Sequence, residues 1–323
     1  MPHEQFSAGQ FAALLSEALA QPIHGVRITG QANRPYSAVW FIEAGTEAGV
    51  VPLVAKSWDT DAAFEKQARI LQEAKALFAK QDSVCIPYLG SVGHKRVLFM
   101  PYVSDPDLAS LCRLSWSWPI HLRYVRHRQE ALEMACARAG KWLREWHTKT
   151  ASNEPVAHSF AAYLERRGKI LNLVSPEERE RIWSLTMRLE VSQTCMSHGD
   201  FTPLNVLWSP RKLTVLDFGL SEWERMTPWW DRVSMEIGLV RALRFTLRGL
   251  GTWFPALCAS AIGAFRRGYG ESDRDAHAKI ACLAVRHLVL YANDVDKGSR
   301  YRHRAAWHRA QLHKVLAEMP AIP

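Results

Sequence analysis

The sequence feature that most constrains the fold is a pair of short apolar runs separated by a polar turn. Val206–Trp208 and Leu213–Leu216 read as strands, and Ser209–Lys212 between them carries turn residues. Asn205 directly precedes the first run, and Asp217 directly follows the second. Because antiparallel pairing brings the open ends of a hairpin together, the pattern predicts that these two polar residues meet.

A carboxylate and an amide oxygen at one point form a hard-oxygen environment that suits Mg²⁺. Asp200 lies five residues before Asn205 in the same loop. Asp200 can therefore face the metal site from the side on which an acceptor substrate would lie.

The first hundred residues alternate between apolar runs and turn residues. The runs predict strands at 25–29, 37–43, 50–58, 88–92 and 97–102, and a long helix at 61–80. The first three strands have tight connections, so they predict an antiparallel meander.

After residue 103 the pattern is mainly helical. Apolar residues at helical spacing predict a helix over 127–148, and another helical block begins near Trp230. Ser175, Pro176 and Glu178 form a helix start, with a capping box closed by the serine and the glutamate. The order predicts an α+β protein with two lobes, 1–103 and 104–323.

The motif His198-x-Asp200-x-x-x-x-Asn205, followed by Asp217-Phe-Gly, resembles the catalytic and metal loops of the protein-kinase superfamily. With Gly199 where protein kinases usually carry arginine, it is similar to the aminoglycoside phosphotransferase branch of small-molecule kinases. The resemblance implies a two-lobed protein-kinase-like fold, with an antiparallel N-lobe sheet and a larger helical C-lobe. It also implies that Asp200 is the catalytic base, that Asn205 and Asp217 hold Mg²⁺, and that His198 braces the loop by hydrogen bonds.

The same resemblance assigns nucleotide-binding residues upstream. Lys56 matches the strand lysine that contacts the phosphates of ATP. Its expected partner is Glu73 in the long helix, with Glu65 as the rival. In the phosphotransferase branch, an aspartate near Asp231 helps to fix the metal loop; a helix N-cap is the alternative.

Two further segments complete the expected nucleotide site. Leu98–Val103 resembles the hinge between lobes, where backbone groups around Met100 and Tyr102 would contact adenine. The first hairpin carries a single glycine, Gly30, where related kinases often have a glycine-rich loop, and Ser37 is the candidate for a phosphate contact there.

The distribution of charged residues suggests which kind of molecule accepts the phosphate. The net charge is +9, and from Arg232 onward Lys and Arg outnumber Asp and Glu by eight. The excess, which includes Arg241, Arg244 and Arg248, suggests an anionic acceptor, such as an acidic sugar, a glycolipid head group or a phosphorylated metabolite. It leaves contact with an anionic membrane surface open, and a solvated helix face is the alternative. No recognisable nucleic-acid module accompanies the basic residues, which argues against nucleic acid.

The sequence therefore predicts an ATP- and Mg²⁺-dependent kinase that phosphorylates a hydroxyl of a small molecule or saccharide. An atypical protein Ser/Thr kinase is an alternative, although no Ala-Pro-Glu element follows the metal loop; a nucleotide-binding pseudokinase or basic scaffold is another. Six irregularly spaced cysteines indicate neither a disulfide framework nor a zinc site. The apolar run at Phe11–Ala20 lacks a preceding Lys or Arg, so it predicts an amphipathic helix of a cytoplasmic protein rather than a signal peptide.

Overall fold

The computed structural model describes residues 5–34, 36–112, 122–153, 164–165, 168–187, 194–218, 225–246, 253–270 and 276–318. The chain divides into two compact units. The first comprises Met1–Leu111 and Leu204–Leu220, and the second comprises Cys112–Pro203 and Ser221–Pro323. This division differs from the predicted boundary at residue 103 because the hairpin after Leu204 pairs with a strand of the first unit.

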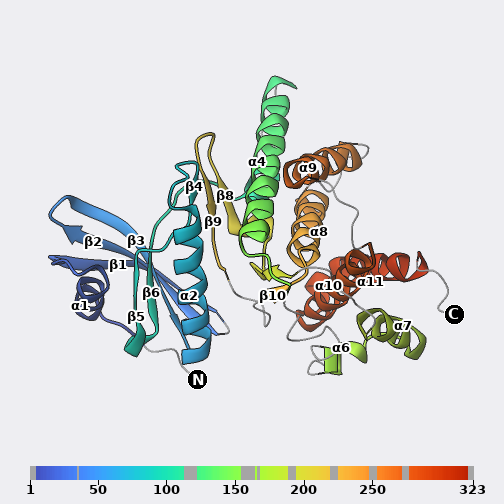
Figure 1. Ribbon diagram of the computed structural model, residues 1–323, viewed down its shortest axis with the longest axis horizontal. Coiled ribbons are helices and arrows are strands. Elements are labelled where there is room, and N and C mark those ends of the chain that lie inside the picture. The colour runs from blue at the N-terminus through green and yellow to red at the C-terminus, as the bar shows by residue number, and fades with distance from the viewer. Residues whose placement is uncertain are drawn as a thin grey trace. The chain divides into compact units, whose positions relative to one another are not determined.

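The first unit is built on a five-stranded antiparallel sheet with the order β1-β2-β3-β6-β5 (Figure 1). Its strands are β1 (Gly25–Arg34), β2 (Ser37–Thr46), β3 (Gly49–Trp58), β5 (Gly90–Val92) and β6 (Val97–Pro101). The predicted meander is confirmed. β1 is longer than expected because, beyond a register shift between Ile28 and Gly30, it continues to pair with β2 as far as Arg34.

Two helices pack on this sheet. α1 (Ala8–Leu19) contacts β1 and β5, and it begins with a capping box between Ser7 and Gln10. Its apolar face inserts Phe11 against Trp40, with ring centroids 5.3 Å apart, so the predicted amphipathic helix is confirmed. α2 (Asp61–Phe78) contacts β3 and starts at Thr60, whose side chain accepts a hydrogen bond from Ala63 N.

The predicted hairpin consists of β8 (Val206–Trp208) and β9 (Leu213–Val215), which pair antiparallel. A third strand, β4 (Val84–Cys85), pairs parallel with β9 and attaches the hairpin to the first unit. Trp208 N also donates a hydrogen bond to Pro106 O. The remaining short elements here are η1 (Gly93–Lys95), α3 (Leu108–Cys112) and η2 (Pro203–Asn205).

The second unit is mainly helical, as predicted. Its helices are α4 (Leu122–Lys149), α6 (Gly168–Leu171), α7 (Pro176–Met187), α8 (Trp229–Thr246), α9 (Trp253–Tyr269), α10 (Ala276–Asp296), η3 (Ser299–Tyr301) and α11 (Arg302–Ala317). A two-stranded ribbon joins β7 (Cys195–Met196) to β10 (Arg225–Met226). The expected capping box at the start of α7 is present, since Ser175 N donates to Glu178 and Glu178 N donates to the Ser175 hydroxyl.

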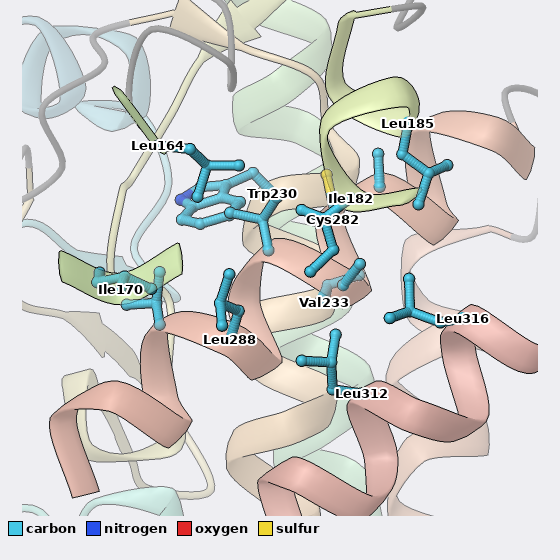
Figure 2. Close-up of a cluster of buried hydrophobic side chains, with 14 of the residues drawn as sticks. Leu164, Ile170, Ile182, Leu185, Trp230, Val233, Cys282, Leu288, Leu312 and Leu316 are labelled. Atoms are coloured by element: carbon cyan, nitrogen blue, oxygen red, sulfur yellow. The ribbon is translucent and has the colours of Figure 1, made fainter. Parts of the chain in front are cut away.

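The helices of the second unit form two packed groups. α4 and α9 run side by side, and a Cβ added at Gly268 would lie 2.0 Å from Ala137 O, so only glycine allows this approach. α6, α7, α8, α10 and α11 enclose a hydrophobic cluster that includes Trp230, Leu288 and Leu312 (Figure 2). Among the described helices, none is both long enough and apolar enough to span a bilayer.

A buried polar cluster joins α8, α10 and α11. His287 Nδ1 and His308 Nδ1 lie 3.0 Å apart, and His308 Nε2 is 3.8 Å from Asp294. Arg304 and Arg241 approach the same Asp294 carboxylate at 3.3 and 3.9 Å. Burial lowers the pKa of His287 to about 4 and that of His308 to about 3, and it raises the pKa of Asp294.

This cluster predicts that the stability of the second unit falls in acid. An unfolded histidine titrates near pH 6.5, so below that pH the unfolded chain binds protons that His287 and His308 in the folded chain exclude. Stability should therefore fall as the pH drops from about 6.5 towards 4, by up to about 1.4 kcal/mol per pH unit for each histidine. Urea unfolding between pH 7.5 and 5 measures the slope. Replacing both histidines by asparagine should flatten it, whereas His303→Asn at an exposed position should not; equal slopes in both variants would contradict the assignment.

Candidate active site

The first unit contains an ion pair between Lys56 and Asp217. β3 places Lys56 in the sheet, where 6% of the residue is exposed, and its Nζ lies 2.8 Å from Asp217 Oδ1. The Lys56 ammonium also lies 5.1 Å from the ring centroid of Trp58. The Asp217 backbone adopts a left-handed conformation with φ 54°, and its side chain is 40% exposed. The pair joins two of the predicted site residues across 161 positions of sequence.

The hairpin places Asn205 at its open end, where Asn205 precedes β8 and Asp217 closely follows β9. Val206 pairs with Val215, and Leu216 N donates a hydrogen bond of 2.8 Å to Asn205 O. The amide of Asn205 and the carboxylate of Asp217 supply the hard oxygen ligands that Mg²⁺ prefers, so this donor set fits the metal. Among the described residues no cluster of three or more His, Cys, Asp or Glu is arranged for a metal ion.

The expected pairing of Lys56 with Glu73 is not what the structure shows. Glu73 pairs instead with Arg69 one helical turn away, and both side chains are more than 40% exposed. Glu73 lies outside the buried face of α2, and Glu65 is exposed. Gln67 occupies that buried face, and its side-chain amide donates to Phe218 O, so Gln67 is the α2 residue that holds the segment after Asp217.

The remaining nucleotide candidates lie on the sheet. Ser37 is buried at the start of β2, opposite Trp58 of β3. Met100 of β6 pairs with Val54 of β3. Tyr102 N already donates to Pro52 O at 3.1 Å, so this backbone amide is engaged, and an adenine edge would need another group of the segment. Gly219, the last residue of the Asp-Phe-Gly motif, lies outside the described residues.

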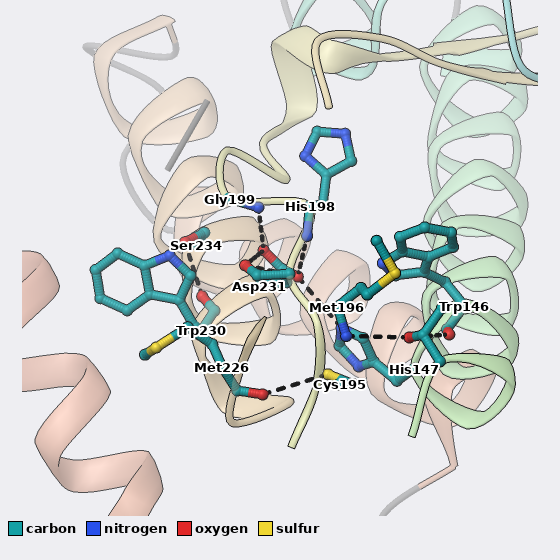
Figure 3. A network of polar contacts seen from close by, with 12 residues as sticks. Trp146, His147, Cys195, Met196, His198, Gly199, Met226, Trp230, Asp231 and Ser234 are labelled. Carbon is teal, nitrogen blue, oxygen red and sulfur yellow. Dashed lines mark hydrogen bonds and ion pairs between the residues drawn. The ribbon is translucent and has the colours of Figure 1, made fainter. Parts of the chain in front are cut away.

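In the second unit, Asp231 anchors the loop that carries His198 and Asp200. Its carboxylate accepts hydrogen bonds from His198 N at 2.8 Å and from Gly199 N at 2.9 Å (Figure 3). The Ser197 hydroxyl at 3.2 Å and His147 Nε2 at 3.3 Å contact the same carboxylate. Asp231 therefore fixes the loop of the predicted base. Its expected role at the metal loop stays a prediction, because residues 219–224 of that loop lie outside the described residues.

Asp231 remains a carboxylate in spite of full burial. Burial alone would raise its pKa, but the hydrogen bond and charge of His147 and the hydrogen bond from His198 N outweigh burial and lower the pKa. Gly199 has φ 85°, a conformation that side chains disfavour, so the glycine lets the loop turn its amide towards Asp231.

His198 braces the loop from within the core. Its residue is fully buried, and its ring packs edge-on against Phe201 at 5.3 Å and Trp142 at 6.3 Å between centroids. Trp142 in turn stacks on Phe201 at 5.4 Å. Figure 3 shows that the backbone nitrogen of His198, rather than its ring, meets Asp231.

Asp200 itself pairs with a residue that the sequence reasoning missed. Arg286 Nη2 of α10 lies 3.1 Å from Asp200 Oδ1, and the two side chains are 13% and 39% exposed. The guanidinium carbon of Arg286 lies 5.3 Å from the ring centroid of Trp230. No local sequence signal could have found this contact, because the partners are 86 residues apart.

The model of the phosphotransferase enzyme family matches residues 31–227, a span that includes Lys56, Asp200, Asn205 and Asp217. The chain belongs to this family. No curated protein sequence matches this phosphotransferase.

Solved structures resemble the phosphotransferase over most of its length. A macrolide 2′-phosphotransferase from Brachybacterium faecium is 15% identical, with a TM-score of 0.50 over 97% of this chain and 100% of that one. A glucosamine kinase in complex with glucosamine, ADP and inorganic phosphate is 14% identical, with a TM-score of 0.51 over 91% and 94%. A choline kinase from Streptococcus pneumoniae is 15% identical, with a TM-score of 0.51 over 92% and 94%. These likenesses establish the α+β kinase-like fold.

Removing the buried anchor should destabilise the phosphotransferase. Asp231→Asn replaces an acceptor of two backbone N–H bonds by an amide that presents its own donors to them, at an expected cost of about 3–5 kcal/mol. Asp296→Asn, at an exposed position, is the matched control and should stay within about 0.5 kcal/mol of the wild type. Urea unfolding followed by tryptophan fluorescence compares the two; equal midpoints would refute the anchoring role.

Proposed function

We propose that this phosphotransferase transfers the γ-phosphate of ATP, with Mg²⁺, to a hydroxyl group of a small molecule or saccharide. The observation that carries the proposal is the 2.8 Å ion pair between Lys56 and Asp217, inside the span that matches the family. A buried ammonium beside a half-exposed carboxylate provides one group for phosphate oxygens and one for a metal ion. The resemblance to a kinase crystallised with ADP supports ATP as the phosphate donor.

The first unit is assigned to the nucleotide. Lys56 would bind phosphate oxygens, while Asn205 and Asp217 would hold Mg²⁺, which neutralises the charge of the phosphates when bound. Gln67 would keep the residue after Asp217 in place through its bond to Phe218 O. Ser37 and the backbone around Met100 remain candidates for phosphate and adenine contacts, and Tyr102 can contribute through groups other than its engaged N–H.

The second unit is assigned to the acceptor. Asp200 would accept the proton of the acceptor hydroxyl as its oxygen attacks the γ-phosphorus. A new P–O bond forms to the acceptor, the bond from the γ-phosphorus to the bridging oxygen breaks, and ADP leaves with that electron pair. His198 and Asp231 act through the loop: the first fills the core beneath it, and the second holds its amides.

Removing the base should slow the chemical step without removing the nucleotide. Asp200→Asn keeps the shape of the side chain but cannot take a proton, so kcat for ATP-dependent phosphorylation should fall by about 10²–10⁴. The thermal shift produced by Mg·ATP should remain. A coupled ADP-release assay and a melting curve measure the two quantities, and a variant with wild-type turnover would exclude Asp200 as the base.

Removing the metal ligand should have the opposite signature. A ligand at 100 times its Kd stabilises the folded state by about 2.7 kcal/mol, and Asp217→Asn should abolish most of that stabilisation by Mg·ATP. Asp82→Asn, an exposed carboxylate of the same unit, is the control and should keep it. Calorimetric melting with Mg·ATP, and with ATP plus EDTA, separates the metal from the nucleotide. An unchanged shift in Asp217→Asn would sink the metal assignment.

A further inference from the structure

The second unit contains a permanent cation in contact with the proposed base. Arg286 donates one hydrogen bond to Asp200 from Nη2, and in the described part of the chain its Nε is buried with no hydrogen-bond partner. Arg286 lies in the middle of α10 and packs against Trp230 of α8. The cation is thus held in position by the same helix whose Asp231 holds the loop of the base.

Four other arginines of the basic C-terminal region pair with buried acids within the unit. Arg241 and Arg304 flank Asp294, Arg266 pairs with Glu236, and Arg309 pairs with Glu178. The side chains of those three acids are between 1% and 11% exposed, so these pairs stabilise helix contacts. Arg248 lies outside the described residues. Arg286 differs because its carboxylate partner is 39% exposed and is the proposed base.

Proton transfer changes the charge of this pair. With Asp200 ionised, Asp200 and Arg286 together are neutral; once Asp200 has taken the proton of the acceptor hydroxyl, they carry a net charge of +1. An anionic group on the acceptor is attracted more strongly to the second state than to the first, so it favours the transition state. An ammonium group on the acceptor would be repelled in that state.

The neighbouring helices carry more cations than acids. Across residues 276–318, which include α10, η3 and α11, there are eight Lys or Arg and three Asp or Glu. Of those acids, Asp294 is buried between arginines and Glu318 lies 3.8 Å from Lys314. A cationic acceptor at Arg286 would therefore find few carboxylates to pair with on these helices.

We propose that Arg286 binds an anionic group of the acceptor, a carboxylate or a phosphate, next to the hydroxyl that is phosphorylated. The fork of guanidinium donors can hold Asp200 and a second oxyanion at once. The proposal rests on the proposed function and specifies its acceptor. Arg286 is then a specificity residue, and the acceptor is an acidic or phosphorylated polyol.

Matched acceptors test the proposal. One series is glycerol, glycerate, glycerol 3-phosphate and 3-amino-1,2-propanediol, and the other is glucose, glucuronate, glucose 6-phosphate and glucosamine. The wild type should prefer an anionic member over its neutral and amine counterparts by at least about 10-fold in kcat/KM, the effect of about 1.4 kcal/mol. The carboxylate and phosphate arms show which anion is bound. Melting with each compound in the presence of Mg·ADP gives an independent binding readout.

The variants separate charge recognition from a structural role. Arg286→Gln should raise KM for the anionic acceptor at least about 10-fold and erase the preference, whereas Arg286→Lys should keep part of it because the charge remains. Lys297→Gln, an exposed cation just after α10, should keep the full preference. Should Arg286→Gln fail to fold, the lysine variant alone must still show an intermediate KM.

Two results would overturn the inference. One is a wild type for which no anionic member is bound or phosphorylated better than its neutral and amine counterparts. The other is an Arg286→Gln variant in which kcat falls equally for all acceptors while KM is unchanged, the pattern of a purely structural contact. Failure of the proposed function itself is distinguishable, because the thermal shift of the wild type with Mg·ATP is measured without an acceptor. A wild type that shows no such shift would contradict the proposed function rather than the role of Arg286.

Discussion

The second unit's site depends on one buried carboxylate. Asp231 accepts the backbone N–H groups of His198 and Gly199, and it does so at a position that water does not reach. A charge there would be costly without partners, and His147 with the two amides supplies them. Because two of the partners are main-chain amides of the loop, the carboxylate fixes the path of the loop itself. The position of Asp200 follows from that path.

Local patterns were sufficient for the elements that position the site. Two short apolar runs around a polar turn, with polar residues at their outer ends, predicted the hairpin of β8 and β9. The structure confirms it, and Asn205 O accepts a hydrogen bond from Leu216 N at its open end. Two-residue strands such as β4 have no period to detect, so the parallel pairing that attaches the hairpin to the first unit was invisible. The expected Lys56–Glu73 pair is absent, and Glu73 pairs with Arg69 instead. Residue spacing predicts only approximately which side chains of a helix share a face, and here Gln67 is the α2 side chain that contacts Phe218.

Long-range ion pairs mark the limit of sequence reasoning. The excess of arginine in the last third is visible as composition, but composition does not say which arginine is neutralised. In the structure Arg241 and Arg304 enclose Asp294, whereas Arg286 reaches Asp200. All three arginines lie in helices, and nothing in the sequence around them tells them apart. Only the packing of α10 against its neighbours distinguishes a structural cation from one at the proposed site.

The two pairs that involve site carboxylates differ in what their cations can do. The Lys56 ammonium is a compact charge held at 2.8 Å from Asp217, with an 8% exposed side chain, so phosphate oxygens that approach it compete with Asp217 for the same charge. In the proposed function, such competition would free Asp217 for a metal ion as the phosphates bind. The Arg286 guanidinium is planar and has five donors, of which one reaches Asp200, so it can take a second anion without releasing the first. The lysine pair is therefore suited to exchange of partners, and the arginine pair to holding Asp200 and an acceptor group together.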